Sequence, residues 1–163
     1  LLHERGYKRI LDVGSELGAF ACLLKKWSPA SEVIGCDISE TAVKKAKSMH
    51  QDIDFEVLDV LNDSFEKLGN FDLVIFSEIL WYVLENLPMV FQKANSLILN
   101  DGVLGIRQYF PKIQNFGCEV INGLHGFESF VSSKTDFVQD RKAVNSTPDG
   151  QVLLATYFQT NTK

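Results

Sequence analysis

Residues 10–20, Ile-Leu-Asp-Val-Gly-Ser-Glu-Leu-Gly-Ala-Phe, decide the fold of this chain. The apolar run Arg9–Val13 enters a turn that carries Gly14 and Gly18, and the apolar-periodic segment Ala19–Trp27 follows at once. This pattern predicts a strand, a tight loop and a helix. The glycines let the backbone bend sharply and leave room for a ligand. The free N–H groups at the helix start suit a carboxylate or phosphate.

A second acidic residue follows the next apolar run. Asp37 comes directly after Glu32–Cys36 and lies 19 positions beyond Gly18, close to the spacing of about 20 at which an acid binds ribose hydroxyls in nucleotide folds. A carboxylate can accept hydrogen bonds from both hydroxyls of a vicinal diol. These features predict a site for an adenosine-containing molecule. The alternative is that Asp37 only caps the helix expected from Glu40.

Five segments in order resemble the motifs of class I S-adenosylmethionine-dependent methyltransferases: Asp12–Gly18, Gly35–Ser39, Phe55–Val60, Phe71–Tyr82 and Leu99–Leu104. The first resembles the family's Asp/Glu-x-Gly-x-Gly-x-Gly motif, but Glu16 stands where the family usually has glycine. The last resembles the Leu-x-x-Gly-Gly turn, with Asp101 in place of the first glycine. The side chain of Glu16 either crowds the ligand or points outward and leaves the loop intact.

The resemblance implies an α/β fold with a doubly wound Rossmann-like methyltransferase sheet, mostly parallel with a C-terminal antiparallel hairpin. We expect one S-adenosylmethionine-binding domain over residues 1–163. The cofactor implied is S-adenosylmethionine, and the residues expected to bind it are Asp12, Gly14, Gly18, Asp37, Ile38, Asp59, Val60 and Ser77.

The resemblance also implies individual roles. In the family the acid at Asp12 orients the glycine loop or contacts the methionine amino group, and the residue at Ile38 lies against adenine. The acid at Asp59 accepts from the adenine amino group, and Val60 donates its backbone N–H. Each role has an alternative: a loop-bracing carboxylate for Asp12, core packing for Ile38, a surface loop position for Asp59 and an ordinary turn for the glycines.

Residues beyond the predicted fourth and fifth strands could bind the substrate, because ligands of open α/β sheets lie at the carboxyl ends of the strands. The candidates are Glu78, Trp81, Tyr82, Arg107 and Tyr109. Trp81 could pack on a cation or belong to the core. No residue is singled out as a catalytic base. Ser77-Glu78-Ile79-Leu80 replaces the Asn/Asp-Pro-Pro-Tyr motif and resembles small-molecule enzymes, including the nodulation-type N-methyltransferases.

The apolar pattern predicts alternating strands and helices. The expected strands are Arg9–Val13, Glu32–Asp37, Asp54–Leu58, Phe71–Ser77, Gly102–Gln108, Lys134–Ala143 and Gly150–Gln159. The expected helices are Gly18–Trp27, Glu40–His50 and Leu84–Leu99, and Pro111–Ser133 is expected to hold a helix and a loop.

Composition narrows the class of protein. The chain has 163 residues, 45% of them hydrophobic, and a net charge of −5, which argues against capture of a nucleic-acid backbone. No apolar run is long enough to span a membrane and no secretory signal is visible. Three widely spaced cysteines suggest neither a metal site nor a disulfide framework, so a cytoplasmic location is expected.

The sequence therefore predicts methyl transfer from S-adenosylmethionine to a small-molecule nucleophile, on nitrogen or oxygen. One alternative is a catalytically inactive methyltransferase-like partner module, which the change at Glu16 permits. Another is a nicotinamide-dependent dehydrogenase, because Gly14–Gly18 follows a strand, although Gly-x-Gly-x-x-Gly is absent.

Overall fold

The computed structural model describes residues 2, 5–29 and 31–160. Its strands are β1 (Arg9–Val13), β2 (Glu32–Asp37), β3 (Asp54–Val57), β4 (Phe71–Ser77), β5 (Ile98–Pro111), β6 (Phe137–Thr147) and β7 (Gly150–Gln159). Its α-helices are α1 (Ala19–Trp27), α2 (Glu40–Met49), α3 (Leu87–Leu97) and α4 (Gly123–Lys134). None of the helices described is both long and apolar enough to cross a membrane.

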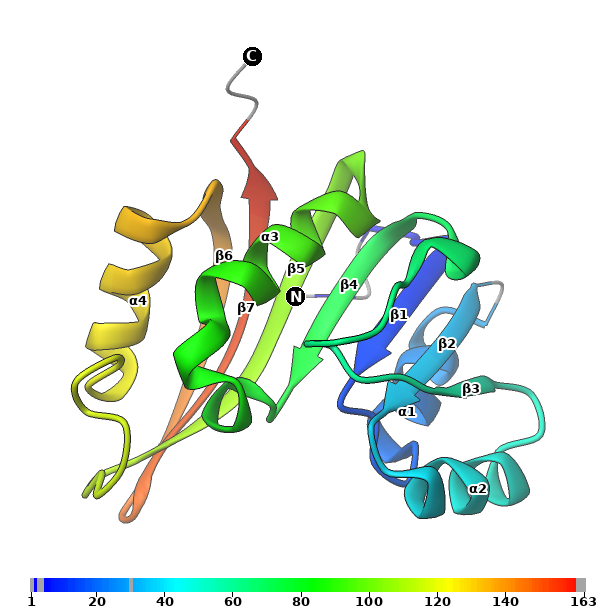
Figure 1. Cartoon of the computed structure of the whole chain (residues 1–163), viewed down its shortest axis with the longest axis horizontal. Helices are drawn as coiled ribbons and strands as arrows, with labels where there is room; N and C mark the ends of the chain where they lie inside the picture. The colour runs from blue at the N-terminus through cyan, green and yellow to red at the C-terminus, as the bar shows by residue number, and fades with distance from the viewer. Residues whose placement is uncertain (1, 3–4, 30, 161–163) are drawn as a thin grey trace.

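Over the described residues the strands form one seven-stranded sheet in the order β3-β2-β1-β4-β5-β7-β6 (Figure 1). The pairs from β3 to β5 are all parallel, whereas β7 pairs antiparallel with both β5 and β6. The expected mixed sheet with a C-terminal antiparallel hairpin is confirmed. The chain order reverses between β1 and β4, which is where α/β sheets of this kind bind ligands.

Helices cover the two faces of the sheet with separate apolar cores. On one face α1 and α2 contribute Ala21, Leu24, Val43 and Ala46 to a cluster with Ile10, Phe55 and Ile75. On the other face α3 and α4 contribute Leu87, Val90, Phe91, Phe127 and Val131 to a larger cluster with Leu11, Val74 and Leu104. Successive strand residues point to opposite faces, so the parallel strands must be apolar on both sides.

The expected helix Leu84–Leu99 is wrong at both ends. Residues Leu84–Asn86 form a 3₁₀ turn, α3 begins at Leu87, and β5 already begins at Ile98. Ile98 pairs with Phe71 in the sheet and is buried, which a helix ending at Leu99 would not allow. Hydrophobicity alone does not separate a buried helix end from a buried strand start.

The expected strand Lys134–Ala143 also has wrong bounds. The α4 helix extends to Lys134, since Phe127 and Val131 lie one turn apart on its buried side, and β6 runs from Phe137 to Thr147. The edge strand β6 is mostly exposed, so it lacks the alternation that would have marked its limits. The region Pro111–Ser133 contains a loop followed by α4, as expected.

The carboxyl ends of β1, β2 and β4 meet at one edge of the sheet. The loop after β1 is fixed there because the backbone N–H groups of Gly14 and Ser15 both donate to the carbonyl of Cys36, at 2.9 and 3.0 Å. Asp37 follows directly at the end of β2. The site residues expected from these loops are therefore brought side by side by the strand order.

Phe91 provides a test of the larger core. Its ring is buried and lies within 6.4 Å, centroid to centroid, of Phe76, Phe127, Phe130 and Phe137. We predict that Phe91→Ala lowers the free energy of unfolding by about 3–5 kcal/mol, because it leaves a cavity among these rings. Urea titration followed by tryptophan fluorescence measures the change. Phe116→Ala, at a ring that is 65% exposed, should change it by less than about 0.5 kcal/mol; equal effects would contradict the assignment.

Candidate functional site

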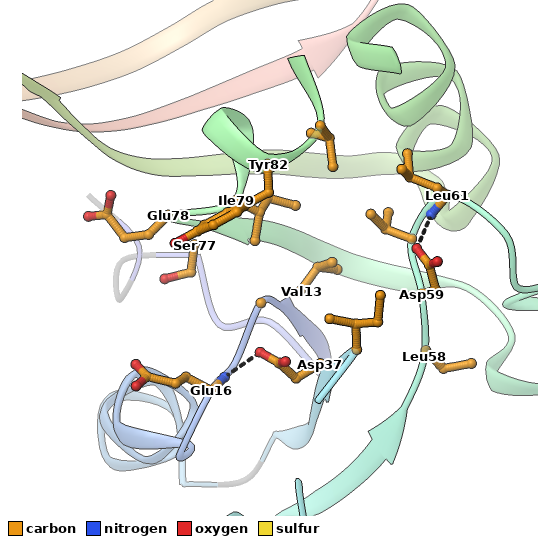
Figure 2. A pocket seen from close by; sticks show the side chains of 14 residues that line it. Val13, Glu16, Asp37, Leu58, Asp59, Leu61, Ser77, Glu78, Ile79 and Tyr82 are labelled. Carbon is orange, nitrogen blue, oxygen red and sulfur yellow. Dashed lines mark hydrogen bonds between the residues drawn. The ribbon is translucent and has the colours of Figure 1, made fainter. Parts of the chain in front are cut away.

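A cavity of about 390 Å³ lies beyond the carboxyl ends of β1, β2, β3 and β4. Figure 2 shows Asp37 and Leu58 on one side of this space, Ile79 and Tyr82 on the opposite side, and Asp59 and Leu61 at its end. Eight of the residues expected from the sequence line it: Gly14, Asp37, Ile38, Asp59, Val60, Ser77, Glu78 and Tyr82. We call it the central cavity.

The glycine loop needs its first glycine for packing as well as for conformation. Gly14 has a φ of 83°, in the left-handed region that favours glycine. A Cβ atom at this position would collide with the side chain of Ile79 and lie 2.9 Å from the carbonyl oxygen of Ser77. The exit of β4 therefore lies directly against the loop, and the two together form the wall of the cavity.

Glu16 occupies the position where the methyltransferases that the sequence resembles usually have glycine. Its backbone has a conformation that favours glycine. Its φ is 50°, one of two positive values at non-glycine residues in the described part of the chain. Its N–H nevertheless donates to Asp37 Oδ2 at 2.9 Å, so the loop keeps its bond to the end of β2. Figure 2 shows its side chain extending away from Asp37 and Leu58. The loop is thus intact with glutamate in place.

The carboxylate of Asp37 is held by two loops at once. Oδ1 accepts from the N–H of Ser39 at 2.9 Å and Oδ2 accepts from that of Glu16 at 2.9 Å. Ser39 in turn caps α2, because its Oγ accepts from the N–H of Ala42 at 3.2 Å. The cap of α2 is therefore Ser39, not Asp37. Each carboxylate oxygen has two lone pairs, so Asp37 keeps one on each oxygen for a ligand in the cavity.

The far end of the cavity combines an apolar wall with a braced acid. Ile38 is 67% exposed although it is a large apolar residue, and its exposed surface lines the cavity. Asp59 Oδ1 accepts from the N–H of Leu61 at 2.8 Å, and Oδ2 from the side chain of Asn62 at 2.6 Å. The bond from Leu61, more than that from Asn62, lowers the pKa of Asp59. Asp59 thus braces its loop and also faces the cavity.

Asp12 lies beneath the glycine loop, outside the lining of the central cavity. It is fully buried, and no well-formed hydrogen bond reaches either carboxylate oxygen, although the backbone N–H of Ala21 in the first turn of α1 lies close enough to stabilise the ionised form. Burial raises its pKa to about 7, an effect that the charge of Arg107 and the N–H of Ala21 oppose and that the charge of Asp37 increases. A buried acid with so little polar support is costly and uncommon in folded proteins, and such groups concentrate at functional sites.

Glu78 is fixed to β5 at the exit of β4. Its Oε2 accepts from the N–H of Tyr109 at 2.8 Å and from Gln108 Nε2 at 3.0 Å, and its Oε1 lies 3.4 Å from Arg107 Nη1. Gln108 is fully buried and accepts the N–H of Leu80 at 3.1 Å. Gln108 and Glu78 therefore hold the chain after β4 in place, which explains the positive φ of 58° at Glu78.

Besides Asp12 and Arg107, three expected residues do not line the central cavity. The indole N–H of Trp81 donates to the carbonyl of Tyr109 at 2.9 Å, and its ring packs edge-on against Phe110. The hydroxyl of Tyr109 donates to the carbonyl of Asp149 at 2.9 Å, in the turn between β6 and β7. A Cβ atom at Gly18 would lie 2.5 Å from the ring of Phe55, so this glycine permits close packing of α1. All three are held by core or turn contacts.

Comparison with known proteins shows to which family the chain belongs. A methyltransferase domain family model matches residues 5–152, which is most of the chain. The chain belongs to the methyltransferase domain family. The class I S-adenosylmethionine-dependent methyltransferase expected from the motifs is confirmed at the level of family and fold.

Relatives with this methyltransferase fold are distant in sequence. A curated relative from Geobacillus sp. (strain WCH70), itself assigned only provisionally as a methyltransferase, is 35% identical over 106 residues, which are 62% of this chain and 42% of that protein. The N-methyltransferase NodS from Bradyrhizobium japonicum WM9 has a TM-score of 0.75 at 17% identity, over 94% of this chain and 79% of NodS. An O-methyltransferase from a polyketide synthase multienzyme of Brevibacillus brevis has a TM-score of 0.71 at 12% identity, over 94% and 67%.

The central cavity has apolar walls that sequence reasoning did not identify as part of the site. Leu58, Leu61 and Val83 line it together with Val13 and Ile79. Leu61 lies two residues beyond Asp59, and its position after an acid that follows a strand was the available signal. Apolar residues near strand ends are not distinguishable from core residues in a sequence, because both serve to exclude water.

The residues present fit the cofactor of the family. Asp37 offers free lone pairs in the cavity, and Ile38 offers an exposed apolar face that a flat aromatic base would cover. The buried carboxylate of Asp12 lies beneath the glycine loop, outside the lining of the cavity, so the fit does not depend on a direct contact with it. Nothing in this arrangement obstructs an elongated ligand that carries a diol, a base and a cation.

The backbone at Glu16 makes a testable difference between two small substitutions. We predict that Glu16→Gly is more stable to unfolding than Glu16→Ala by about 1 kcal/mol, because alanine keeps a Cβ in the left-handed region. Thermal unfolding of both variants measures the difference. At Glu40, in the first turn of α2, Glu40→Ala should instead be more stable to unfolding than Glu40→Gly, since a helix favours alanine. The same order at both positions would contradict the strained conformation.

Burial of Asp12 should make stability depend on pH. The folded pKa of about 7 lies above the ordinary value of 3.8, so the folded state keeps a proton that the unfolded chain has lost between these values. Stability should therefore fall as pH rises from 4 to 8, by a contribution on the order of 4 kcal/mol. Asp12→Asn should lack this loss and be the more stable protein at pH 8. Urea titrations across this pH range test it, with Asp54→Asn as the control; parallel curves for wild type and Asp12→Asn would contradict it.

Proposed function

We propose that this protein transfers a methyl group from S-adenosylmethionine to a nitrogen or oxygen atom of a small molecule. The observation that carries the proposal is the carboxylate of Asp37, which two backbone N–H groups fix in the central cavity with a free lone pair on each oxygen. The family assignment supports it, and NodS, one of the similar structures, was crystallised with S-adenosylhomocysteine.

Each part of the cofactor has a partner in this assignment. Asp37 would accept from the two ribose hydroxyls, and Ile38 would pack against the adenine ring. Asp59 would accept from the adenine amino group with the lone pairs that Leu61 and Asn62 leave free, and Val60 would donate its N–H to the base. Gly14 and Ser77 would flank the sulfur-bearing chain, because their backbones already lie against each other.

The methyl acceptor would enter beside the exit of β4. Tyr82 is 85% exposed and lines the central cavity there, next to Ile79 and Glu78. The exit lacks the paired prolines that accompany methylation of amino groups in nucleic acids, and the net charge of −5 disfavours a polyanionic acceptor. Similar structures include both an N- and an O-methyltransferase. A small amine or hydroxyl compound is therefore the proposed acceptor.

The residues would act mainly by binding and orientation. When bound, S-adenosylmethionine supplies an electrophilic methyl group on a sulfonium. Proximity and alignment of two bound reactants can account for much of such a rate enhancement. Leu58, Val83 and Ile79 would keep water from the reacting atoms, since they form the apolar part of the cavity wall. Glu78 is already bonded to β5, so we assign it to positioning, not to proton removal.

Isothermal titration with S-adenosylmethionine and S-adenosylhomocysteine tests the proposal. We predict binding by the wild type, and a loss of affinity of roughly tenfold or more in Asp37→Ala, because at least one charge-assisted hydrogen bond to the ribose is removed. Asp37→Asn should retain part of the affinity, since its amide oxygen still accepts. Asp54→Ala, an exposed carboxylate at the opposite end of the sheet, should bind as the wild type does.

Other outcomes would change the assignment. Absence of binding by folded wild-type protein would overturn the proposal. Binding without transfer to any amine or hydroxyl compound would favour the inactive partner module. Preferential binding of NADH would favour the dehydrogenase, an alternative that the family assignment does not support.

A further inference from the structure

Three charged or polar side chains lie on the α1-facing side of the sheet, beside the glycine loop. Asp12 pairs with Ile75 in the register of β1 and β4, and Ser77 pairs with Arg107 in that of β4 and β5. Residues two apart on a strand share a face, so Asp12, Ser77 and Arg107 point to the same side. A hollow next to the central cavity is lined by Ser77 and Arg107 but not by the buried Asp12, and Gly14, Glu16, Ser77 and Glu78 line both spaces.

Arg107 has donor capacity to spare in this hollow. Its Nη1 lies 3.3 Å from Ser77 Oγ and 3.4 Å from Glu78 Oε1, both long contacts. Within the described part of the chain, Nε and Nη2 make no hydrogen bond, although the guanidinium lies over the ring of Phe20 and the side chain is 38% exposed. A guanidinium has five N–H donors and binds carboxylates through two of them at once.

The strand order gives the direction in which the cofactor must extend. Asp59 and Val60 follow β3 and Asp37 ends β2, so a ligand with its base at the first and its ribose at the second points along the order β3-β2-β1-β4-β5. The chain attached to the ribose would then cross the glycine loop after β1 and reach Ser77 of β4. Arg107 of β5 comes next, and its guanidinium already extends back over β4 to Ser77.

We propose that Arg107 binds the carboxylate at the amino-acid end of the cofactor. The proposal rests on the proposed function and assigns Arg107 to cofactor recognition, where sequence reasoning assigned it to the acceptor pocket. The hollow that Arg107 lines shares Gly14, Glu16, Ser77 and Glu78 with the central cavity, so its guanidinium lies next to the space assigned to the rest of the cofactor. Its unused N–H donors would pair with a carboxylate there.

Two compounds that differ only at this end provide the test. S-Adenosylhomocysteine carries the amino acid, whereas 5′-methylthioadenosine has the same adenosine and sulfur without it. We expect Arg107→Met to weaken S-adenosylhomocysteine roughly tenfold or more and to change the affinity for methylthioadenosine less than about twofold. Arg107→Lys should give an intermediate loss, since it keeps the charge without the paired donors. Lys112→Met, an exposed cation just beyond β5, should change neither affinity.

Each result separates the two proposals. Unchanged binding of S-adenosylhomocysteine by Arg107→Met would overturn the role of Arg107. An equal loss for both compounds would also overturn it, because that result shows a structural effect on the whole site. If the wild type binds both compounds and Asp37→Ala weakens both, the proposed function stands whatever Arg107 does. If the folded wild type binds neither, both proposals fail together.

Discussion

The carbonyl oxygen of Cys36 is the contact on which the site depends. It accepts from Gly14 and Ser15, and thereby fixes the loop after β1 to the end of β2. Asp37 can then accept from the N–H of Glu16, which joins the same two loops through a side chain. The two bonds to a single carbonyl are possible only because Gly14 takes a left-handed conformation. Without that turn, the helix α1 would not begin where it does, and Asp37 would lose half of its support.

Charge is arranged in two groups on either side of this loop. Asp37 and Asp59 face the central cavity with their oxygens bonded to backbone N–H groups, and the bond from Leu61 lowers the pKa of Asp59. Asp12 is fully buried, and the loss of hydration outweighs the N–H of Ala21, so the same kind of side chain has a pKa of about 7 there. The positive charge of Arg107 opposes this rise in the pKa of Asp12. The difference follows from environment alone, since all three acids lie at or near the carboxyl ends of parallel strands.

Much of the fold could be predicted from the sequence, because parallel strands buried on both faces leave continuous apolar runs. The bounds of β1, β2, β4 and β7 match the predicted ones, and β3 ends one residue early. The predicted strand Gly102–Gln108 is too short, because β5 runs from Ile98, where one apolar run passes from helix to strand, to Pro111. The bounds of β6 were also wrong, because an exposed edge strand has no pattern. Local sequence does not record which partner, helix or strand, buries a given side chain.

By itself the sequence determined the order of elements, the glycine turn and the acids at the strand ends, since these depend on local periodicity and on residue type. Only the tertiary structure decided which of them face one another. Trp81 lies just beyond β4 and Tyr109 lies near the end of β5, yet contacts with Phe110 and Asp149 hold them away from the central cavity. Arg107 and Asp12 are 95 residues apart and share a face only through the register of β1, β4 and β5. Long-range pairing fixes such relations, and no local pattern contains it.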